Sequence, residues 1–200
     1  VTRLLCSEAS VNGMRARRGT LTGDDFDRLT IARERLQDAE IWIDDTRELG
    51  VADIGSRCRK IASGLNAPLG LVLVDHLQFV KYRGPATTGA AAIGAIMQGF
   101  KSLAAELGCP LMIASHLNRK ADDPLSKKPT LAHLKDSGSI EQDSDQVLFL
   151  HGERDKPVRE LIVAKARGAE LGSAWLYFER PYTRFDSFIA PGFSQWELAA

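Results

Sequence analysis

Polar and charged side chains follow directly after three short apolar runs of the sequence. They are Asp75-His76-Leu77-Gln78, Ser115-His116-Leu117-Asn118-Arg119 and Lys165-Ala166-Arg167-Gly168. In open α/β sheets, ligands bind beyond the carboxyl ends of the parallel strands. These three segments are therefore the first candidates for chemistry.

Asp75 ends a continuously apolar run, residues 69–74. A buried strand that ends in Asp is typical of nucleoside triphosphate sites, where the carboxylate holds the shell of a magnesium ion. Many α/β strands also end in Asp simply as a loop cap. Asp75 alone leaves both interpretations open.

A second candidate is the stretch Leu134–Asp145, Leu-Lys-Asp-Ser-Gly-Ser-Ile-Glu-Gln-Asp-Ser-Asp. Small, flexible residues separate a basic residue from a dense acidic run, and such a loop can present backbone N–H groups to phosphate. The same composition suits the solvated start of a helix, where acids favour the helix dipole. A hard-cation site of Glu141, Asp143 and Asp145 is a further alternative, although helical spacing would splay the carboxylates.

The elements that would position these side chains follow from periodicity. Thr22 and Asp25 have the spacing of a capping box, and apolar residues then recur at helical intervals, which predicts a helix over about residues 24–38. The apolar run Ile41–Ile43 predicts a short strand. Apolar residues that step by four, three and four over residues 54–65 predict the next helix.

Residues 69–74 predict a central parallel strand covered by helices on both faces, because they are apolar throughout rather than alternating. A long helical pattern follows and ends at Gly108, with Pro110 two residues on. Further strands are expected at residues 111–114, 147–150 and 161–164, and a hairpin at 174–178 and 185–189 that turns near Pro181.

Alternating strands and helices in the first two thirds of the chain predict an α/β fold with a mainly parallel, twisted sheet flanked by helices. The C-terminal section adds an antiparallel edge or hairpin. No internal repeat, low-complexity tract or linker divides the sequence. We therefore expect residues 1–200 to form a single, partial domain.

Composition sets limits on the class of protein. With 44% hydrophobic and 26% charged residues, the 200 residues fit one globular domain or a large piece of one. No apolar run reaches the roughly 20 residues that cross a bilayer, which predicts a soluble, cytoplasmic protein with no membrane partner. The three cysteines are widely spaced and predict buried, reduced thiols. Zero net charge means that any contact with nucleic acid must be local.

Five strings carry a resemblance to a known family. They are Leu-Val-Asp-His-Leu-Gln, Ser-His-Leu-Asn-Arg, the whole 134–145 stretch, Ala-Lys-Ala-Arg-Gly and Tyr-Thr-Arg-Phe-Asp. In order and approximate spacing they resemble the C-terminal ATPase domain of DnaB-type replicative DNA helicases, from about Val1 to Asp186. The Ser-Gly-Ser-Ile-Glu-Gln-Asp run is the most diagnostic of these strings.

The resemblance implies a RecA-like fold, a homo-hexameric ring with ATP bound between neighbouring subunits, and single-stranded DNA in the central channel. Asp75 would position Mg²⁺ and its water. Lys165 and Arg167 would reach the γ-phosphate on the neighbouring subunit; the alternative is edge-strand charge that prevents aggregation. His116 stands where the family usually has Gln, a sensor of the γ-phosphate, and His76 stands where Tyr is common.

Further nucleotide and DNA contacts are implied in the same way. Gln78, Arg184 and Phe185 are counted as nucleotide-binding, the last two near the adenine, with a core position as the alternative for Phe185. Four residues would contact DNA: Arg119, Lys135, Asp136 and Gly138. The span from Arg119 to Lys135 holds five Lys or Arg against two Asp, which would line a basic pore when repeated around a ring.

Two elements of the family's motor do not occur in the sequence. There is no GxxxxGK[ST] string, the P-loop that cradles the phosphates of ATP. The family's catalytic glutamate and its primase-binding N-terminal domain would also lie before Val1. Because the chain opens in mid-pattern, we expect a truncated or processed product that is inactive as an ATPase on its own.

The leading interpretation is part of an ATP-dependent helicase, of 5′–3′ type by resemblance, that translocates on single-stranded DNA and unwinds duplex DNA. Primase and a helicase loader are possible partners. The alternative is a non-catalytic DNA-binding or ring-interaction module derived from that family. A different RecA-like ATPase, such as a recombinase, would share the strand-end Asp but not the loop at residues 134–145.

Overall fold

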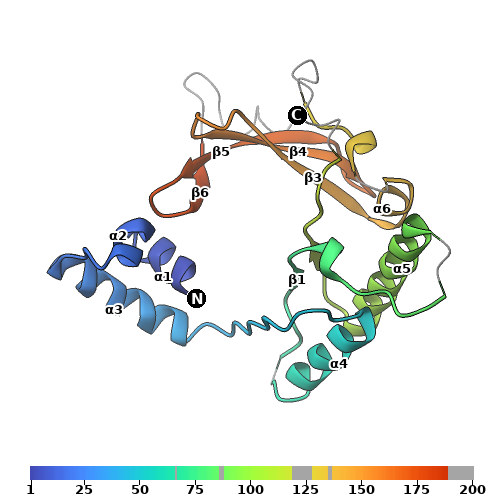
Figure 1. Cartoon of the computed structure of the whole chain (residues 1–200), viewed down its shortest axis with the longest axis horizontal. Coiled ribbons are helices and arrows are strands. Elements are labelled where there is room, and N and C mark those ends of the chain that lie inside the picture. Colours follow the sequence, from blue (N-terminus) through green and yellow to red (C-terminus); the bar gives the residue numbers. More distant parts are fainter. Residues whose placement is uncertain (66, 86–87, 119–127, 135–136, 189–200) are drawn as a thin grey trace. The chain divides into compact units, whose positions relative to one another are not determined.

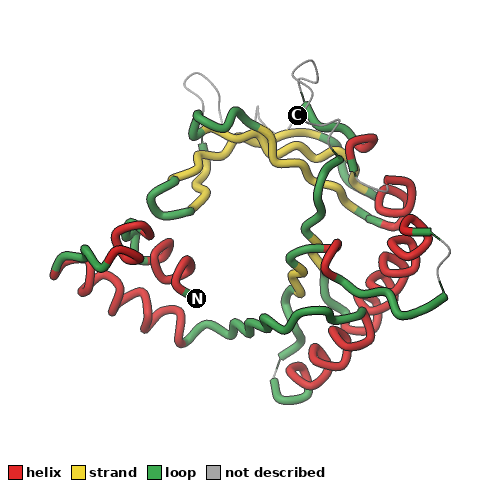
Figure 2. The backbone as a smooth tube through the Cα atoms, in the orientation of Figure 1, coloured by secondary structure: helices red, strands yellow, loops and turns green. Residues whose placement is uncertain are grey.

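The computed structural model describes residues 1–65, 67–85, 88–118, 128–134 and 137–188 (Figures 1 and 2). The chain packs into two compact units. Unit 1 comprises Val1–Asp44, Phe149–Ile162 and the residues from Gly172 on, and unit 2 comprises Asp45–Leu148 and Val163–Leu171. That residues 1–200 form a single domain stays a prediction.

Three helices open unit 1: α1 (Thr2–Glu8), α2 (Gly13–Arg18) and α3 (Gly23–Gln37). Helix α1 packs against both others. A small core of Ala9, Val11 and Ala32 forms between them, with Leu21 and Leu29 packed on it. The predicted helix over residues 24–38 is confirmed as α3.

The start of α3 is the capping box that the sequence predicts. Thr22 Oγ1 accepts from the N–H of Asp25, and an Asp25 carboxylate oxygen accepts from the Thr22 N–H at 2.9 Å. Asp25 is only 1% exposed, and Arg28 and Arg15 add ion pairs at 2.8 and 3.0 Å. Asp25 therefore has a second role as a buried carboxylate that forms two ion pairs, and the Thr22–Asp25 spacing did not predict this role.

The strand predicted at Ile41–Ile43 is wrong. These residues lie outside any helix or strand, and Ile41, Trp42 and Ile43 are 53%, 48% and 59% exposed. A strand needs a neighbour for its N–H and C=O groups. No strand of the described residues pairs with this run.

Unit 2 is organised around two packed helices, α4 (Val51–Ala62) and α5 (Gly89–Leu107) (Figure 1). Helix α5 buries Ile96, Met97, Phe100 and Leu103. It ends at Gly108, whose φ of +62° is the left-handed conformation that glycine adopts without a Cβ penalty. Both predicted helices are confirmed, including this C-cap.

The parallel sheet of unit 2 consists of β1 (Val72–Val74) and β2 (Leu111–Ile113), with Leu73 opposite Met112. The expectation of a strand buried on both faces is wrong. Leu73 and Met112 are 61% and 49% exposed, because the described helices do not cover this face. The strand is also shorter than the apolar run at residues 69–74.

Four strands form the second sheet, in the order β3-β4-β5-β6: Gln146–His151, Val158–Ala166, Gly172–Glu179 and Arg184–Ser187. Strands β5 and β6 are antiparallel, with Phe178 opposite Phe185, so the hairpin turning near Pro181 is confirmed. Together, helices, a parallel pair and an antiparallel hairpin confirm the predicted α/β class.

Helix α6 (Ser137–Asp143) packs on α5 in unit 2. The contact is close at Gly94, where a Cβ would lie 2.9 Å from Oγ of Ser139. The predicted helix is confirmed at Ser137–Asp143, but its first turn holds no acidic residue, so the expected interaction of acids with the helix dipole at this end is wrong. Phosphate binding by this stretch stays a prediction. Lys135 and Asp136 lie outside them.

Candidate nucleotide-binding site

The ends of β1 and β2 meet at one edge of the parallel sheet. Val74 is paired with Ile113, and the chain continues from both at the same edge. The N–H of Ala114 donates to the carbonyl of Val74 at 2.9 Å, and the N–H of Leu77 donates to the carbonyl of Ala114 at 2.8 Å. The structure thus brings together the Asp75 and His116 segments, as parallel pairing predicts.

Gln78 bridges the two segments with its side-chain amide. Its Nε2 donates to Oγ of Ser115 at 3.0 Å, and its Oε1 accepts from the backbone N–H of His116 at 3.3 Å. Oε1 also lies 2.9 Å from Nδ1 of His76. The resemblance implied that Gln78 binds nucleotide. Nothing in the spacing of the sequence predicted that Gln78 would connect the two segments or that Ser115 would accept its hydrogen bond.

Three aromatic rings cluster at this edge. The ring of His76 stacks on Phe79 with centroids 4.3 Å apart and contacts the ring of His116 at 4.0 Å. Phe79 is 67% exposed. The peptide bond between Asp75 and His76 is cis.

Asp75 is exposed, and its carboxylate has no hydrogen bond or ion pair with any residue that the structure describes. It is free to bind a hard cation. No group of three or more His, Cys, Asp or Glu within the described ranges could hold a metal. Mg²⁺ typically takes one or two carboxylates and completes its octahedron with waters and phosphate oxygens.

Lys165 and Arg167, at the end of β4, hold the last turn of α6. Arg167 Nη2 donates to the carbonyl of Gln142 at 2.8 Å, and Lys165 Nζ donates to the carbonyl of Glu141. Helix C-termini attract cations because their last carbonyls are unpaired and carry the negative end of the helix dipole. Both basic residues are therefore bound to groups of the same chain.

Asp145 is shared by two cations. Its Oδ1 accepts from Lys101 Nζ at 2.8 Å and from Arg167 Nη1 at 3.2 Å. The hydrogen bond from Lys101, together with the charges of Lys101, Arg167 and Lys165, holds the pKa of Asp145 below its ordinary value. Because this carboxylate is committed to cations, the alternative of a metal site with Glu141 and Asp143 is wrong for the described residues.

Arg184 and Phe185 lie in unit 1, on β6. The Arg184 guanidinium pairs with Glu179 at 2.9 Å and Asp186 at 3.0 Å, and also donates to Oγ of Ser10 at 2.8 Å. The hydrogen bond to Asp186 and the charges of Asp186 and Glu179 raise the pKa of Arg184. Phe185 packs on Phe178, with centroids 4.7 Å apart, and is 43% exposed.

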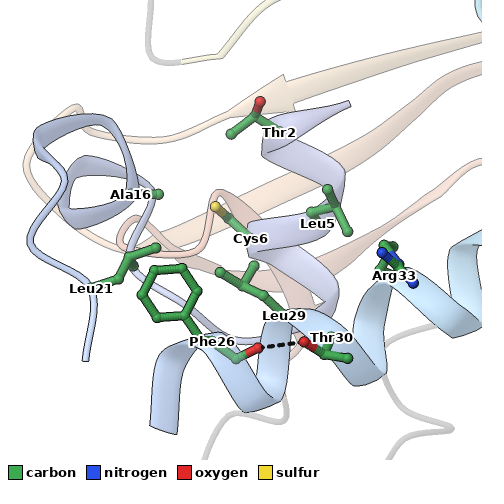
Figure 3. A pocket seen from close by; sticks show the side chains of 9 residues that line it. All are labelled: Thr2, Leu5, Cys6, Ala16, Leu21, Phe26, Leu29, Thr30 and Arg33. Atoms are coloured by element: carbon green, nitrogen blue, oxygen red, sulfur yellow. Dashed lines mark hydrogen bonds between the residues drawn. The ribbon is translucent and has the colours of Figure 1, made fainter. Parts of the chain in front are cut away.

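An apolar pocket of about 330 Å³ lies among α1, α2 and α3 of unit 1 (Figure 3). Its lining consists of Thr2, Leu5, Cys6, Ala16, Leu21, Phe26, Leu29, Thr30 and Arg33. None of the predicted site residues lines it. The pocket therefore adds nothing to the strand-end site.

Comparison with known proteins identifies the family. The family model of the DnaB-like helicase C-terminal domain matches residues 1–187. The chain belongs to this family. The replicative DNA helicase DnaB of Geobacillus stearothermophilus is 34% identical over 193 residues, which are 92% of this chain and 42% of that protein. The replicative DNA helicase DnaC of Bacillus subtilis is 34% identical over 208 residues, 96% of this chain and 45% of that protein.

Solved structures show the same fold. A DnaB-like replicative helicase, described with its interactions with primase, superposes with a TM-score of 0.87 at 26% identity, covering 94% of this chain and 47% of that one. A separately solved ATPase domain gives 0.86 at 27% identity, covering 94% and 69%. The RecA-like fold expected from the resemblance is confirmed. The chain spans less than half the length of the curated DnaB-like relatives named above.

The DNA-contacting residues expected for a DnaB-like helicase are only partly visible. Gly138 lies in the first turn of α6, whereas Arg119, Lys135 and Asp136 lie outside the described residues. Within the described part of the chain, no helix combines the length and apolarity needed to cross a membrane.

Proposed function

We propose that this chain is part of the motor of a hexameric replicative DNA helicase, which couples ATP hydrolysis to translocation along single-stranded DNA and unwinding of the duplex. The observation that carries the proposal is the strand-end site. There Gln78 links the Asp75 segment to the His116 segment at the carboxyl edge of a parallel strand pair. Ligands of open α/β sheets bind at this kind of edge.

Asp75 is the proposed ligand of the magnesium shell. His116 is the proposed group that contacts the γ-phosphate. Bound Mg²⁺ would neutralise charge on the phosphate oxygens during hydrolysis. The P-loop that grips the phosphates has no counterpart in the 200 residues. We therefore expect ATPase activity only when this chain is joined to a segment that supplies a P-loop.

Lys165 and Arg167 are the proposed fingers for ATP on the neighbouring subunit. Their contacts with α6 and Asp145 show which bonds would have to be exchanged for phosphate. The exchange is accessible, because the Arg167 side chain is 53% exposed. An arginine finger in other phosphoryl-transfer enzymes contributes about 10³ to 10⁵ in rate.

For the adenine, Phe185 is the better of the two proposed contacts. Its ring keeps an exposed face, whereas the Arg184 guanidinium is committed to Glu179, Asp186 and Ser10. Arg119, Lys135, Asp136 and Gly138 are proposed to contact the DNA backbone. We also propose a 5′–3′ polarity and a cytoplasmic location. The proposed partners are a primase and a helicase loader.

The finger role is tested by complementation between subunits, in a protein that joins this chain to its P-loop segment. Arg167→Ala subunits and subunits with an inactive P-loop are each expected to lack ATPase activity alone. Mixed rings should regain activity, because a P-loop from one subunit then faces an intact Arg167 from its neighbour. If Arg167 acted on ATP of its own subunit, no mixed ring would recover. Arg154→Ala, at an exposed turn, is the control and should remain active alone.

The DNA contact is tested by the salt dependence of single-strand binding. Lys135→Ala should weaken binding and reduce the slope of log K against log salt by about 0.7 for each phosphate that is no longer neutralised. Lys60→Ala, an exposed change on α4, should leave the slope unchanged. A slope that does not respond to Lys135→Ala would remove this residue from the channel. If the protein that includes the P-loop segment bound DNA but had no ATPase activity, the non-catalytic module would be favoured.

A further inference from the structure

We infer that Gln78 is a positioning residue: it fixes neutral His76 in the tautomer with the proton on Nδ1, and it ties the main chain of His116 to the end of β1. Its role in an ATP site depends on the proposed function. The tautomer and the tie depend only on the hydrogen bonds of unit 2.

The orientation of the Gln78 amide follows from its neighbours. The backbone N–H of His116 can only donate, so the atom 3.3 Å away must be the acceptor, Oε1. The NH₂ group then faces Oγ of Ser115 at 3.0 Å, which can accept. The opposite orientation would set two donors against each other at His116 and is disfavoured.

The tautomer of His76 follows from that orientation. Its Nδ1 lies 2.9 Å from Oε1, an atom that can only accept. Two acceptors do not form a hydrogen bond, so Nδ1 must carry the proton. Neutral imidazole has one N–H, so Nε2 is left with a lone pair.

Ring packing keeps this imidazole in place. His76 stacks on Phe79 at 4.3 Å and contacts the ring of His116 at 4.0 Å. No residue of the described chain hydrogen-bonds to Nε2 of His76. In the neutral form of His76, Nε2 is therefore the ring nitrogen that can accept a hydrogen bond from a bound water or hydroxyl group.

One acceptor atom serves both segments. Oε1 of Gln78 accepts hydrogen bonds from the backbone N–H of His116 and from Nδ1 of His76. A displacement of the His116 segment, as when it meets a phosphate, would therefore disturb the bond that holds His76. We assign to Gln78 the link between these two strand ends.

The test uses the 200-residue chain without nucleotide or DNA. Long-range ¹H–¹⁵N NMR spectra, recorded at alkaline pH where ordinary imidazoles are neutral, distinguish the two tautomers of His76. We expect the Nδ1–H form in the wild type and in Gln78→Glu, whose carboxylate also accepts. Gln78→Leu should shift His76 toward the Nε2–H form that predominates in free histidine. Gln98→Leu, an exposed change on α5, is the control.

Amide exchange at His116 provides a second measurement. Loss of the acceptor in Gln78→Leu should speed exchange of this N–H roughly two- to tenfold, whereas Gln78→Glu should not. An Nε2–H form of His76 in the wild type would overturn the inference, even if Gln78→Leu failed to fold. An unchanged tautomer in a folded Gln78→Leu variant would do the same. Failure of subunit complementation would instead count against the proposed function alone.

Discussion

Asp145 holds Arg167 at two points. Its carboxylate oxygen Oδ1 lies 3.2 Å from Nη1 of the guanidinium, and its backbone carbonyl accepts a 2.8 Å hydrogen bond from the N–H of Arg167. The main-chain hydrogen bond holds the backbone of Arg167, and the ion pair contacts the guanidinium at the end of its side chain. Lys101 binds the same oxygen at 2.8 Å, so the carboxylate connects helix α5 to the turn that follows β4.

Replacing Asp145 with Asn should loosen the side chain of Arg167, which then keeps its hydrogen bond to the carbonyl of Gln142, while the main-chain bond persists. The Coulombic attraction from both cations is removed, but the backbone carbonyl is unchanged. We expect increased mobility at Arg167 Nε in ¹⁵N relaxation measurements. Asp143→Asn, at the last residue of α6, is the matched control and should leave Arg167 as it is.

Acidification should break the same ion pairs below the ordinary carboxylate range. The pKa of Asp145 is lowered chiefly by the hydrogen bond from Lys101, so the pairs persist above the unfolded value of about 3.9 and are lost as the pH falls through the lower folded pKa. A pH titration of the Asp145 carboxyl ¹³C shift would measure this. A midpoint at or above the ordinary value would contradict the observed pairing.

The cap of α3 should contribute measurably to the stability of unit 1. Thr22→Ala removes the hydroxyl that accepts from the Asp25 N–H, and loss of such a cap costs about 0.5–2 kcal/mol. Urea unfolding would measure the change. Thr30→Ala, in the same helix, is the control: its hydroxyl donates to the carbonyl of Phe26 within the helix (Figure 3). Equal effects of the two substitutions would argue against the cap.

Low pH should weaken this cap as well. The hydrogen bonds from the backbone and side chain of Thr22 lower the pKa of Asp25, and Arg15 and Arg28 act in the same direction. Its contribution to stability is therefore present above the unfolded value and lost as the pH falls through the folded pKa. Asp25→Asn should flatten the acid limb of the stability curve, whereas the exposed Asp24→Asn should not.

The contact between α4 and α5 requires a small residue at position 99. A Cβ on Gly99 would lie 3.2 Å from Cγ1 of Val51, so Gly99→Val should overpack the interface and cost about 1–3 kcal/mol. Val51→Ala makes room for the added methyl groups. The double variant should therefore be more stable than the sum of the two single changes predicts, as a double-mutant cycle by urea unfolding would show. Additive effects would contradict the close approach.

Cys58 and Cys109 should react slowly with alkylating reagents in the folded chain. Burial raises the pKa of both thiols, with Cys109 adding to the effect at Cys58, and only the thiolate is a strong nucleophile. We expect both to be labelled rapidly in denaturant and slowly without it, as peptide mass spectrometry would show. Rapid labelling of the folded chain would contradict their burial.

Local chemistry made part of the structure predictable from the sequence. The Thr22 and Asp25 spacing determines where α3 begins, because capping is settled within a few residues. Gly108 determines where α5 ends, because only glycine enters the left-handed region without strain. The parallel pairing of β1 and β2, which brings Asp75 and His116 to one edge, follows from the alternation of strands and helices.

Only the tertiary structure decided which partners these residues have. Gln78 bridges to Ser115 and His116 across a long sequence separation. Arg167 and Lys101 likewise share Asp145, although both are far from it in the sequence. The run Ile41–Ile43 shows the same limit in reverse, since it has the composition of a strand but no paired neighbour among the described residues. Hydrogen bonds and ion pairs form between whichever groups the packed elements bring within about 3 Å. Spacing along the chain alone does not contain that information.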